Sequence, residues 1–176
     1  MKPLKIVCAL LLCLSWTNSW AQDVQKLGLT ATQKQTVEEY KSLSYRIMGE
    51  YYTSYASLFN LCQQFPDDKD CGDKYHQAES QYRTAKSINS VFNMLIDKQM
   101  TDTLLPFVAY PDVSRSLIAL ERIDEPKDNG QVSEKVLNEA VNQWMREHQL
   151  PQTQQMYMLQ YVMIRTDANK EILGIK

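Results

Sequence analysis

The chain has 176 residues, of which 19 are Lys or Arg and 21 are Asp or Glu, so its formal net charge is −2. A mildly acidic surface offers no electrostatic basis for binding nucleic acid or anionic lipid, which attract basic patches. We therefore expect no nucleic-acid partner. A protein partner with a basic face fits this charge better.

The first 21 residues have the three parts of a secretory signal peptide. Lys2 and Lys5 form a basic start, and the apolar run over 6–14 is shorter than the roughly 20 residues of a membrane-spanning helix. Ser19 and Ala21 place small residues where signal peptidase cleaves. The pattern predicts cleavage after Ala21, a periplasmic or secreted protein, and no membrane span after cleavage. An uncleaved anchor is the alternative.

Cleavage would leave 155 residues, 17 of them basic and 21 acidic, with a net charge of −4. That length suits one domain. The remaining chain has few glycines and is rich in Gln, Glu, Lys, Leu, Met and Ala, which favour helix, and no stretch shows a sustained two-residue alternation. We predict an all-α fold and a single helical domain over 22–176.

Two of the four cysteines, Cys62 and Cys71, remain after cleavage. In an oxidising compartment such a close pair predicts a disulfide, and closing a loop of about ten residues would stabilise the fold by roughly 2–3 kcal/mol. A zinc site would need more ligands than His76, the one histidine nearby. A redox pair would be expected at C-x-x-C spacing.

A first helix is predicted to begin at a capping box formed by Thr30 and Gln33, with Leu29 just before it. On a helical wheel, the apolar and tyrosine residues that follow fall within about 100° and form one buried stripe. The helix is therefore predicted to run from Thr30 to about Gln63. The stripe consists of Val37, Tyr40, Ile47, Met48, Tyr51, Tyr55, Leu58 and Cys62.

A second helix is predicted to begin after Gly72 and to reach Thr101 or beyond, until Pro106. Cys62 lies at the end of the first helix and Cys71 at the start of the second, so a bridge between them would clamp the corner of a long antiparallel helical hairpin. The face of the second helix consists of Tyr75, Ala78, Tyr82, Ala85, Phe92 and Leu95.

The sequence pattern predicts shorter helices in the second half of the chain. One covers 112–122, a polar linker follows over 124–131, and another helix is capped by Ser133. Leu150 and Pro151 separate it from a last helix with Met156, Leu159, Val162 and Met163 on one face. The predicted architecture is thus a disulfide-clamped antiparallel hairpin with two or three shorter helices, packed as one bundle.

The sequence contains no recognisable catalytic, metal-binding or cofactor-binding motif. After cleavage the chain has two histidines, His76 and His148, both expected at helix surfaces or flanks. Zincin, nucleophile-elbow and phosphate-loop patterns are absent from the sequence. Its acidic residues are spread over predicted solvent faces. We therefore predict binding without turnover, and neither a cofactor nor a metal site.

Four residues are candidates for contact with a partner. Tyr45 and Tyr52 lie about 90–110° from the centre of the first helix's stripe, just outside its edge, where a ring with a solvated hydroxyl makes a good contact. Met156 and Met158 lie towards opposite edges of the last helix's stripe and suit an adaptable binding face. The alternative is that the tyrosines pack within the bundle and the methionines fill its core.

Residues 29–33 (LTATQ) resemble the LTxxQ signature of the Spy/CpxP-like periplasmic proteins, and 150–154 (LPQTQ) resemble a second copy with Pro in place of Thr. Members of that family are small, exported, all-helical chaperones or sensor inhibitors of envelope stress. The resemblance implies a chaperone-like, protein-binding role in the cell envelope. The chain differs from the family in its acidic charge, its cysteine pair and its longer second half. The alternative function is an immunity or inhibitor protein that neutralises a toxin or hydrolase in the envelope.

The signal-peptide assignment makes a direct prediction. Protein purified from the envelope fraction should begin at Gln22, because cleavage is expected after Ala21. N-terminal sequencing or intact-mass measurement tests this. An intact Met1, or a lipid on Cys13, would contradict it.

Overall fold

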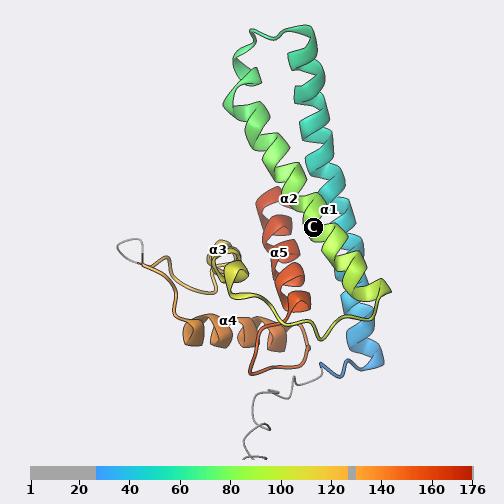
Figure 1. Cartoon of the computed structure of the whole chain (residues 1–176), viewed down its shortest axis with the longest axis vertical. Coiled ribbons are helices and arrows are strands. Elements are labelled where there is room, and N and C mark those ends of the chain that lie inside the picture. The colour runs from blue at the N-terminus through green and yellow to red at the C-terminus, as the bar shows by residue number, and fades with distance from the viewer. Residues whose placement is uncertain (1–26, 127–129, 176) are drawn as a thin grey trace, which may run out of the picture.

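The computed structural model describes residues 27–126 and 130–175. The predicted signal peptide and positions 127–129 of the predicted linker lie outside these ranges. The described residues form an all-α fold with no β-strand, as predicted from the sequence (Figure 1). None of their helices is long and apolar enough to cross a membrane. The helices are α1 (Ala31–Gln64), α2 (Asp73–Asp97), α3 (Tyr110–Ala119), α4 (Glu134–Glu147) and α5 (Met158–Leu173), with 3₁₀ turns η1 (Lys69–Cys71) and η2 (Phe107–Ala109).

Helices α1 and α2 form the predicted antiparallel hairpin, with η1 at its tip (Figure 1). Helix α1 begins at the predicted capping box. The backbone N–H of Gln33 donates to Thr30 Oγ1 at 3.3 Å, and the N–H of Thr30 donates to Gln33 Oε1 at 3.0 Å. Cys62 and Cys71 lie at disulfide-bonding distance with their Cα atoms 5.3 Å apart, at the corner where the sequence places the bridge.

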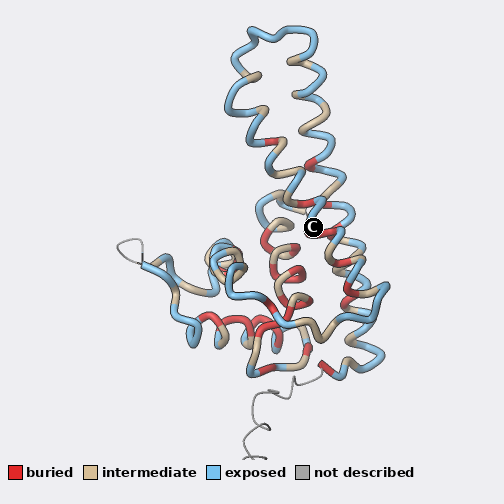
Figure 2. The backbone as a smooth tube through the Cα atoms, in the orientation of Figure 1, coloured by how far each residue is buried: buried red, intermediate tan, exposed pale blue. Residues whose placement is uncertain are grey.

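The core lies at the end of the hairpin away from the tip, where buried residues gather (Figure 2). Helix α5 packs there against α1, α2 and α3. Its buried residues spread over roughly two thirds of the helix circumference at about 100° per residue, which is typical of a central helix. The largest fully buried side chains that surround it include Phe92 and Leu95 of α2, Leu117 of α3, and Leu137 and Trp144 of α4.

Helix α5 begins at Met158, so Met156, which the sequence pattern places on this helix, lies before it. The chain before it is extended and pairs with the segment after α2. The N–H of Leu105 donates to the carbonyl oxygen of Met156 at 2.8 Å, and the N–H of Met158 donates to that of Thr103 at 2.8 Å. These two hydrogen bonds hold Met156 outside the helix.

The prediction that α2 reaches Thr101 or beyond is wrong, because α2 ends at Asp97. Gln99 adopts a left-handed conformation with φ 54°. Its N–H donates to the carbonyl oxygen of Ile96, and the N–H of Met100 donates to that of Leu95, which is the Schellman hydrogen-bond pattern. Helices α3 and α4 end in the same pattern, with Glu121 (φ 55°) and Gln149 (φ 57°) at the left-handed position.

These non-glycine caps can be improved. A residue with a Cβ in the left-handed region costs roughly 1–2 kcal/mol, against roughly 0.5–1 kcal/mol for the greater flexibility of glycine in the unfolded chain. Gln99→Gly should therefore raise the free energy of unfolding by about 0.5–1 kcal/mol, measured by denaturant titration. Lys98→Gly is the matched control, because Lys98 has φ −97° and should only lose stability. Equal destabilisation by both variants would contradict the left-handed cap.

Candidate functional site

The outer half of the hairpin projects beyond the rest of the fold. Leu173 and Ile175, at the C-terminal end, pack against a small cluster of Ile47, Tyr51 and Ala85, partway along α1 and α2. Figures 1 and 2 show that no other described helix lies beside the hairpin beyond this level, where all its described residues except the buried Ala78 are exposed or half-buried. The projecting part therefore presents the apolar face of two helices without a third helix to cover it.

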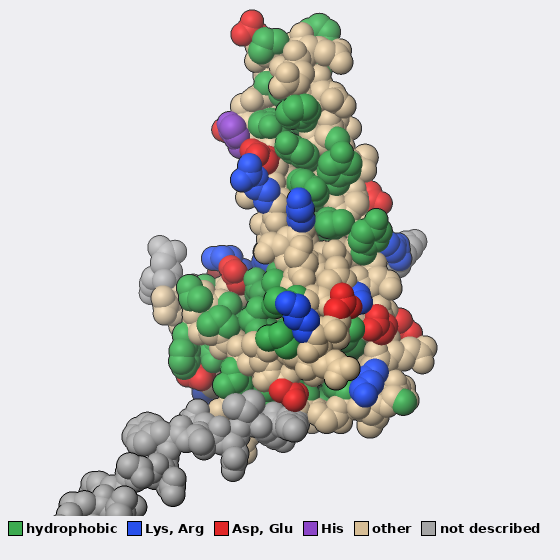
Figure 3. All heavy atoms as spheres, turned by 45° about the vertical axis from the view of Figure 1, so that its right-hand side comes forward, with side chains coloured by type: hydrophobic (Ala, Val, Ile, Leu, Met, Phe, Trp, Pro, Cys, Tyr) green, Lys and Arg blue, Asp and Glu red, His purple; other side chains and the backbone are tan. Residues whose placement is uncertain are grey.

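Five aromatic residues occupy this uncovered face, and we call them the tyrosine surface. The rings of Tyr55 and Tyr82 are stacked with centroids 5.5 Å apart and planes 12° apart, and Tyr75 lies 5.9 Å from Tyr55. Tyr52 is 5.3 Å from Tyr82, and Phe59 is 6.0 Å from Tyr55. Figure 3 shows hydrophobic side chains running along the projecting hairpin, with Lys and Arg beside them. The rings thus form one continuous contact area.

The residues of the tyrosine surface differ in their exposure to solvent. The side chains of Tyr52 and Phe59 are 52% and 40% exposed, whereas Tyr55, Tyr75 and Tyr82 are half-buried between the two helices. The sequence pattern places these last three residues on core-facing stripes, so it does not identify them as site residues. Comparing the lengths of the helices could have identified these residues. The hairpin helices have 34 and 25 residues, so a last helix of 16 residues cannot cover their whole length.

Tyr45 lies closer to the core and is 65% exposed. Its position is seven residues, or about two turns, before Tyr52, which puts both side chains on the same side of α1. Tyr45 forms part of the wall of a shallow groove of about 420 Å³ between α1 and α2. The other residues of this groove are Glu38, Lys41, Ser42, Arg46, Asn89 and Asn93.

The two candidate methionines lie away from the hairpin tip, at the start of α5 (Figure 1). Met156 is 3% exposed and belongs to the main core, so the prediction that it contacts a partner is wrong. The backbone pairing that keeps it out of α5 also turns it inward. Met158 is partly buried and packs against the same core. Neither methionine extends the tyrosine surface.

A polar cluster joins α1, α4 and α5 beside the core. Trp144 Nε1 donates to Asp167 Oδ2 at 2.9 Å, and His148 Nε2 lies 3.8 Å from the same oxygen. The ring of Tyr40 packs edge-on against those of Trp144 and His148. Burial and the nearby Asp167 carboxylate raise the pKa of Tyr40 above its usual range. A phenol held neutral in this way is a poor base or nucleophile, so the cluster serves to connect three helices.

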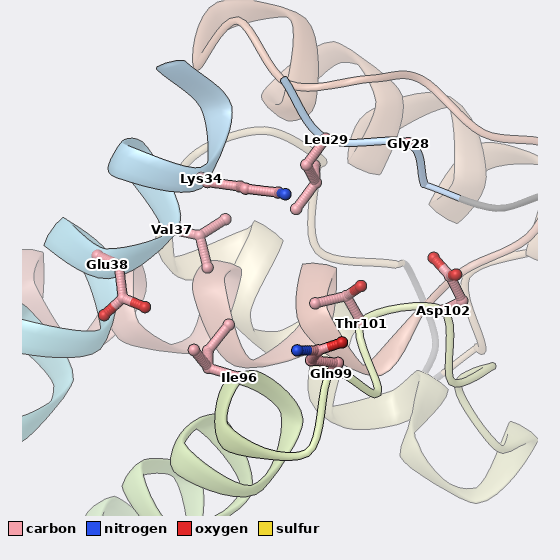
Figure 4. A pocket seen from close by; sticks show the side chains of 9 residues that line it. All are labelled: Gly28, Leu29, Lys34, Val37, Glu38, Ile96, Gln99, Thr101 and Asp102. Atoms are coloured by element: carbon pink, nitrogen blue, oxygen red, sulfur yellow. The ribbon is translucent and has the colours of Figure 1, made fainter. Parts of the chain in front are cut away.

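A cavity of about 530 Å³ opens where residues 28 and 29 lie against α1 and the end of α2 (Figure 4). The backbone N–H of Leu27 donates to Asp102 Oδ1 at 2.8 Å and fixes this segment. Figure 4 shows the Lys34 side chain extending across the cavity towards Leu29, with Glu38 and Asp102 also on its lining. Its charged lining groups are of both signs, so they do not select one class of ligand.

Within residues 27–126 and 130–175, no three His, Cys, Asp or Glu side chains gather where they could hold a metal ion. Comparisons with protein-family models, curated proteins and solved structures find no match for the chain. The resemblance to the Spy/CpxP-like proteins thus stays a prediction. The tyrosine surface remains the candidate site on its geometry.

The cysteine bridge at the hairpin tip makes a stability prediction. Cys62→Ser combined with Cys71→Ser should lower the free energy of unfolding by roughly 2–3 kcal/mol, because the unfolded chain regains the entropy of an open loop. Thermal melting tests this, and reductant should bring the wild-type protein to the same midpoint as the variant. Labelling of both thiols by alkylation of unreduced, denatured protein would show that the bridge is absent.

Proposed function

We propose that this chain is an exported protein-binding protein of the cell envelope, and that the tyrosine surface of its hairpin contacts a protein partner without chemical turnover. The observation that carries the proposal is the set of exposed, mutually packed rings on a part of the fold that the core does not cover. Tyrosine is enriched at protein interfaces, because it combines a large apolar ring with a polar end.

The packing of the rings favours one dedicated partner. Tyr55 and Tyr82 are stacked on each other, and Tyr52 rests against Tyr82, so little side-chain entropy remains to be lost on binding. Proteins that bind many clients instead use flexible, often methionine-rich surfaces. Of the two methionines predicted for such a face, Met156 is buried and Met158 is partly buried. These features favour an inhibitor or immunity role, in which the hairpin neutralises a toxin or hydrolase in the envelope.

A chaperone-like role has separate support from the two motif copies. The Nε2 of Gln33, in the first copy, donates to the carbonyl oxygen of Gln149 at 2.8 Å. Gln149 directly precedes the second copy, so the two copies meet at the start of α1. This contact gives Gln33 of the first copy a structural role beyond capping α1.

Replacing one exposed ring of the tyrosine surface tests the proposal. Tyr52→Ala should leave the melting midpoint nearly unchanged, because the side chain is 52% exposed, and should weaken partner binding by roughly 2–4 kcal/mol, the scale of aromatic hot spots. Melting curves are measured first. Binding is then compared by capture from an envelope extract on immobilised protein and by titration with the recovered partner.

Phe107→Ala is the matched control, because Phe107 is an equally large ring that is 73% exposed but lies in η2, outside the hairpin. It should bind as the wild type does. Equal capture by wild type and Tyr52→Ala would refute the proposed contact surface. One stoichiometric protein in the captured fraction indicates an inhibitor, and many unfolded proteins indicate a chaperone.

A further inference from the structure

The side of the hairpin that carries Tyr45 and Tyr52 is turned away from the C-terminal end. On a wheel of about 100° per residue, these tyrosines lie about 100–160° from Ile47 and Tyr51, the buried residues of α1 beside which Leu173 and Ile175 pack. Phe59 continues the same side towards the tip. Tyr45, Tyr52 and Phe59 are 65%, 52% and 40% exposed, so no described helix covers this side of α1.

The three exposed rings of α1 are spaced symmetrically about Tyr52. Tyr45 precedes it by seven residues and Phe59 follows it by seven, so each lies about 10 Å from it along the helix. A two-fold axis beside Tyr52, perpendicular to the helix, would place Tyr45 of one copy against Phe59 of another. It would also place Tyr52 against its own equivalent. Such self-complementarity is what an interface with two-fold symmetry requires.

The charges of α2 follow the same axis. Tyr82 is level with Tyr52, because their ring centroids are 5.3 Å apart. An axis between Tyr82 and Arg83 exchanges Glu79 with Lys86. The Lys86 ammonium lies 6.0 Å from the centroid of the Tyr82 ring and forms no ion pair within the described residues. Glu79 accepts from Arg83 through Oε1 at 2.6 Å, which leaves its other oxygen for Lys86 of a second copy.

The overlap of two such hairpins is large enough for a specific interface. The axis beside Tyr52 exchanges Ser42 with Cys62, so the copies would overlap along about 30 Å of α1. Two packed helices are about 20 Å wide, so each copy would cover about 600 Å² and the pair about 1,200 Å². That total lies at the lower limit of standard interfaces, so we expect a weak, reversible dimer.

We propose that the tyrosine surface of the free protein binds a second copy of the chain, and that the two hairpins pack antiparallel as a four-helix bundle. The second copy supplies the layer that α5 is too short to provide, and it buries the exposed rings. The inference rests on the tyrosine surface of the proposed function and names a second copy as a partner of that surface. Any other partner has to displace this copy.

A charge-exchange experiment tests the pairing. The dissociation constant of the dimer is measured by sedimentation equilibrium of the chain from Gln22 to Lys176, over micromolar to millimolar concentrations. Lys86→Glu should weaken the dimer roughly tenfold, because two carboxylates then face each other at both ends of the axis. Glu79→Lys should weaken it similarly. An equimolar mixture of the two variants should recover the wild-type affinity, because every lysine of the mixed dimer faces a glutamate.

Lys135→Glu is the matched control, because it reverses the charge of an exposed lysine in α4, outside the hairpin. It should dimerise as the wild type does. Three results would overturn the inference. They are a monomer at all concentrations, a dimer that Lys86→Glu leaves unchanged, and a mixture that associates no more tightly than either variant alone. Circular dichroism checks that each variant keeps its helices.

Partner capture gives a separate result. If the chain stays monomeric while Tyr52→Ala weakens capture, the second copy is refuted and the proposed contact with another protein stands. If the mixture restores the dimer while Tyr52→Ala leaves capture unchanged, the tyrosine surface serves self-association and the proposed contact fails.

Discussion

Helix α5 is enclosed by other helices, and its length limits how much of the hairpin the core can cover. It packs against α1, α2 and α3, and Asp167 in its second half accepts a hydrogen bond from Trp144 of α4. Its 16 residues span about 24 Å, whereas the 34 residues of α1 span about 51 Å. A core assembled around α5 therefore ends near Tyr51 and Ala85. The outer half of the hairpin has to be stable with two helices alone.

Two kinds of contact hold this outer half together. The Cys62–Cys71 bridge joins the helices at the tip, and the rings of Tyr55, Tyr75 and Tyr82 fill the space between them. These half-buried rings contribute to stability, and they also support the more exposed Tyr52 and Phe59 from beneath. An exposed ring that rests on another ring has fewer rotamers available than one surrounded by water. The structural role of the inner rings thus makes the outer rings better contact residues.

Local signals in the sequence predicted the elements well, and errors arose where distant contacts decide the outcome. Thr30 and Ser133 cap α1 and α4 as predicted, because capping depends on neighbouring residues only. The sequence pattern places the end of α2 too late, because Gln99 takes the left-handed position usually held by glycine. Met156 was assigned to a helix, but pairing with Leu105 draws it into the core. A helical wheel places Tyr82 on the apolar face of α2. It does not show that α5 ends before it could cover this residue.

The outer half of the hairpin is rich in aromatic residues, which supports the proposed contact with a protein partner. Two helices joined by a disulfide can be solvated by polar and charged residues, which keep a projecting arm soluble. Here the arm carries five packed rings, two of which are 52% and 40% exposed, in a part of the molecule that adds nothing to the main core. Exposed aromatic area of this kind favours association. The exposed rings of Tyr52 and Phe59 are the part of the outer hairpin that the proposed contact with a protein partner would cover.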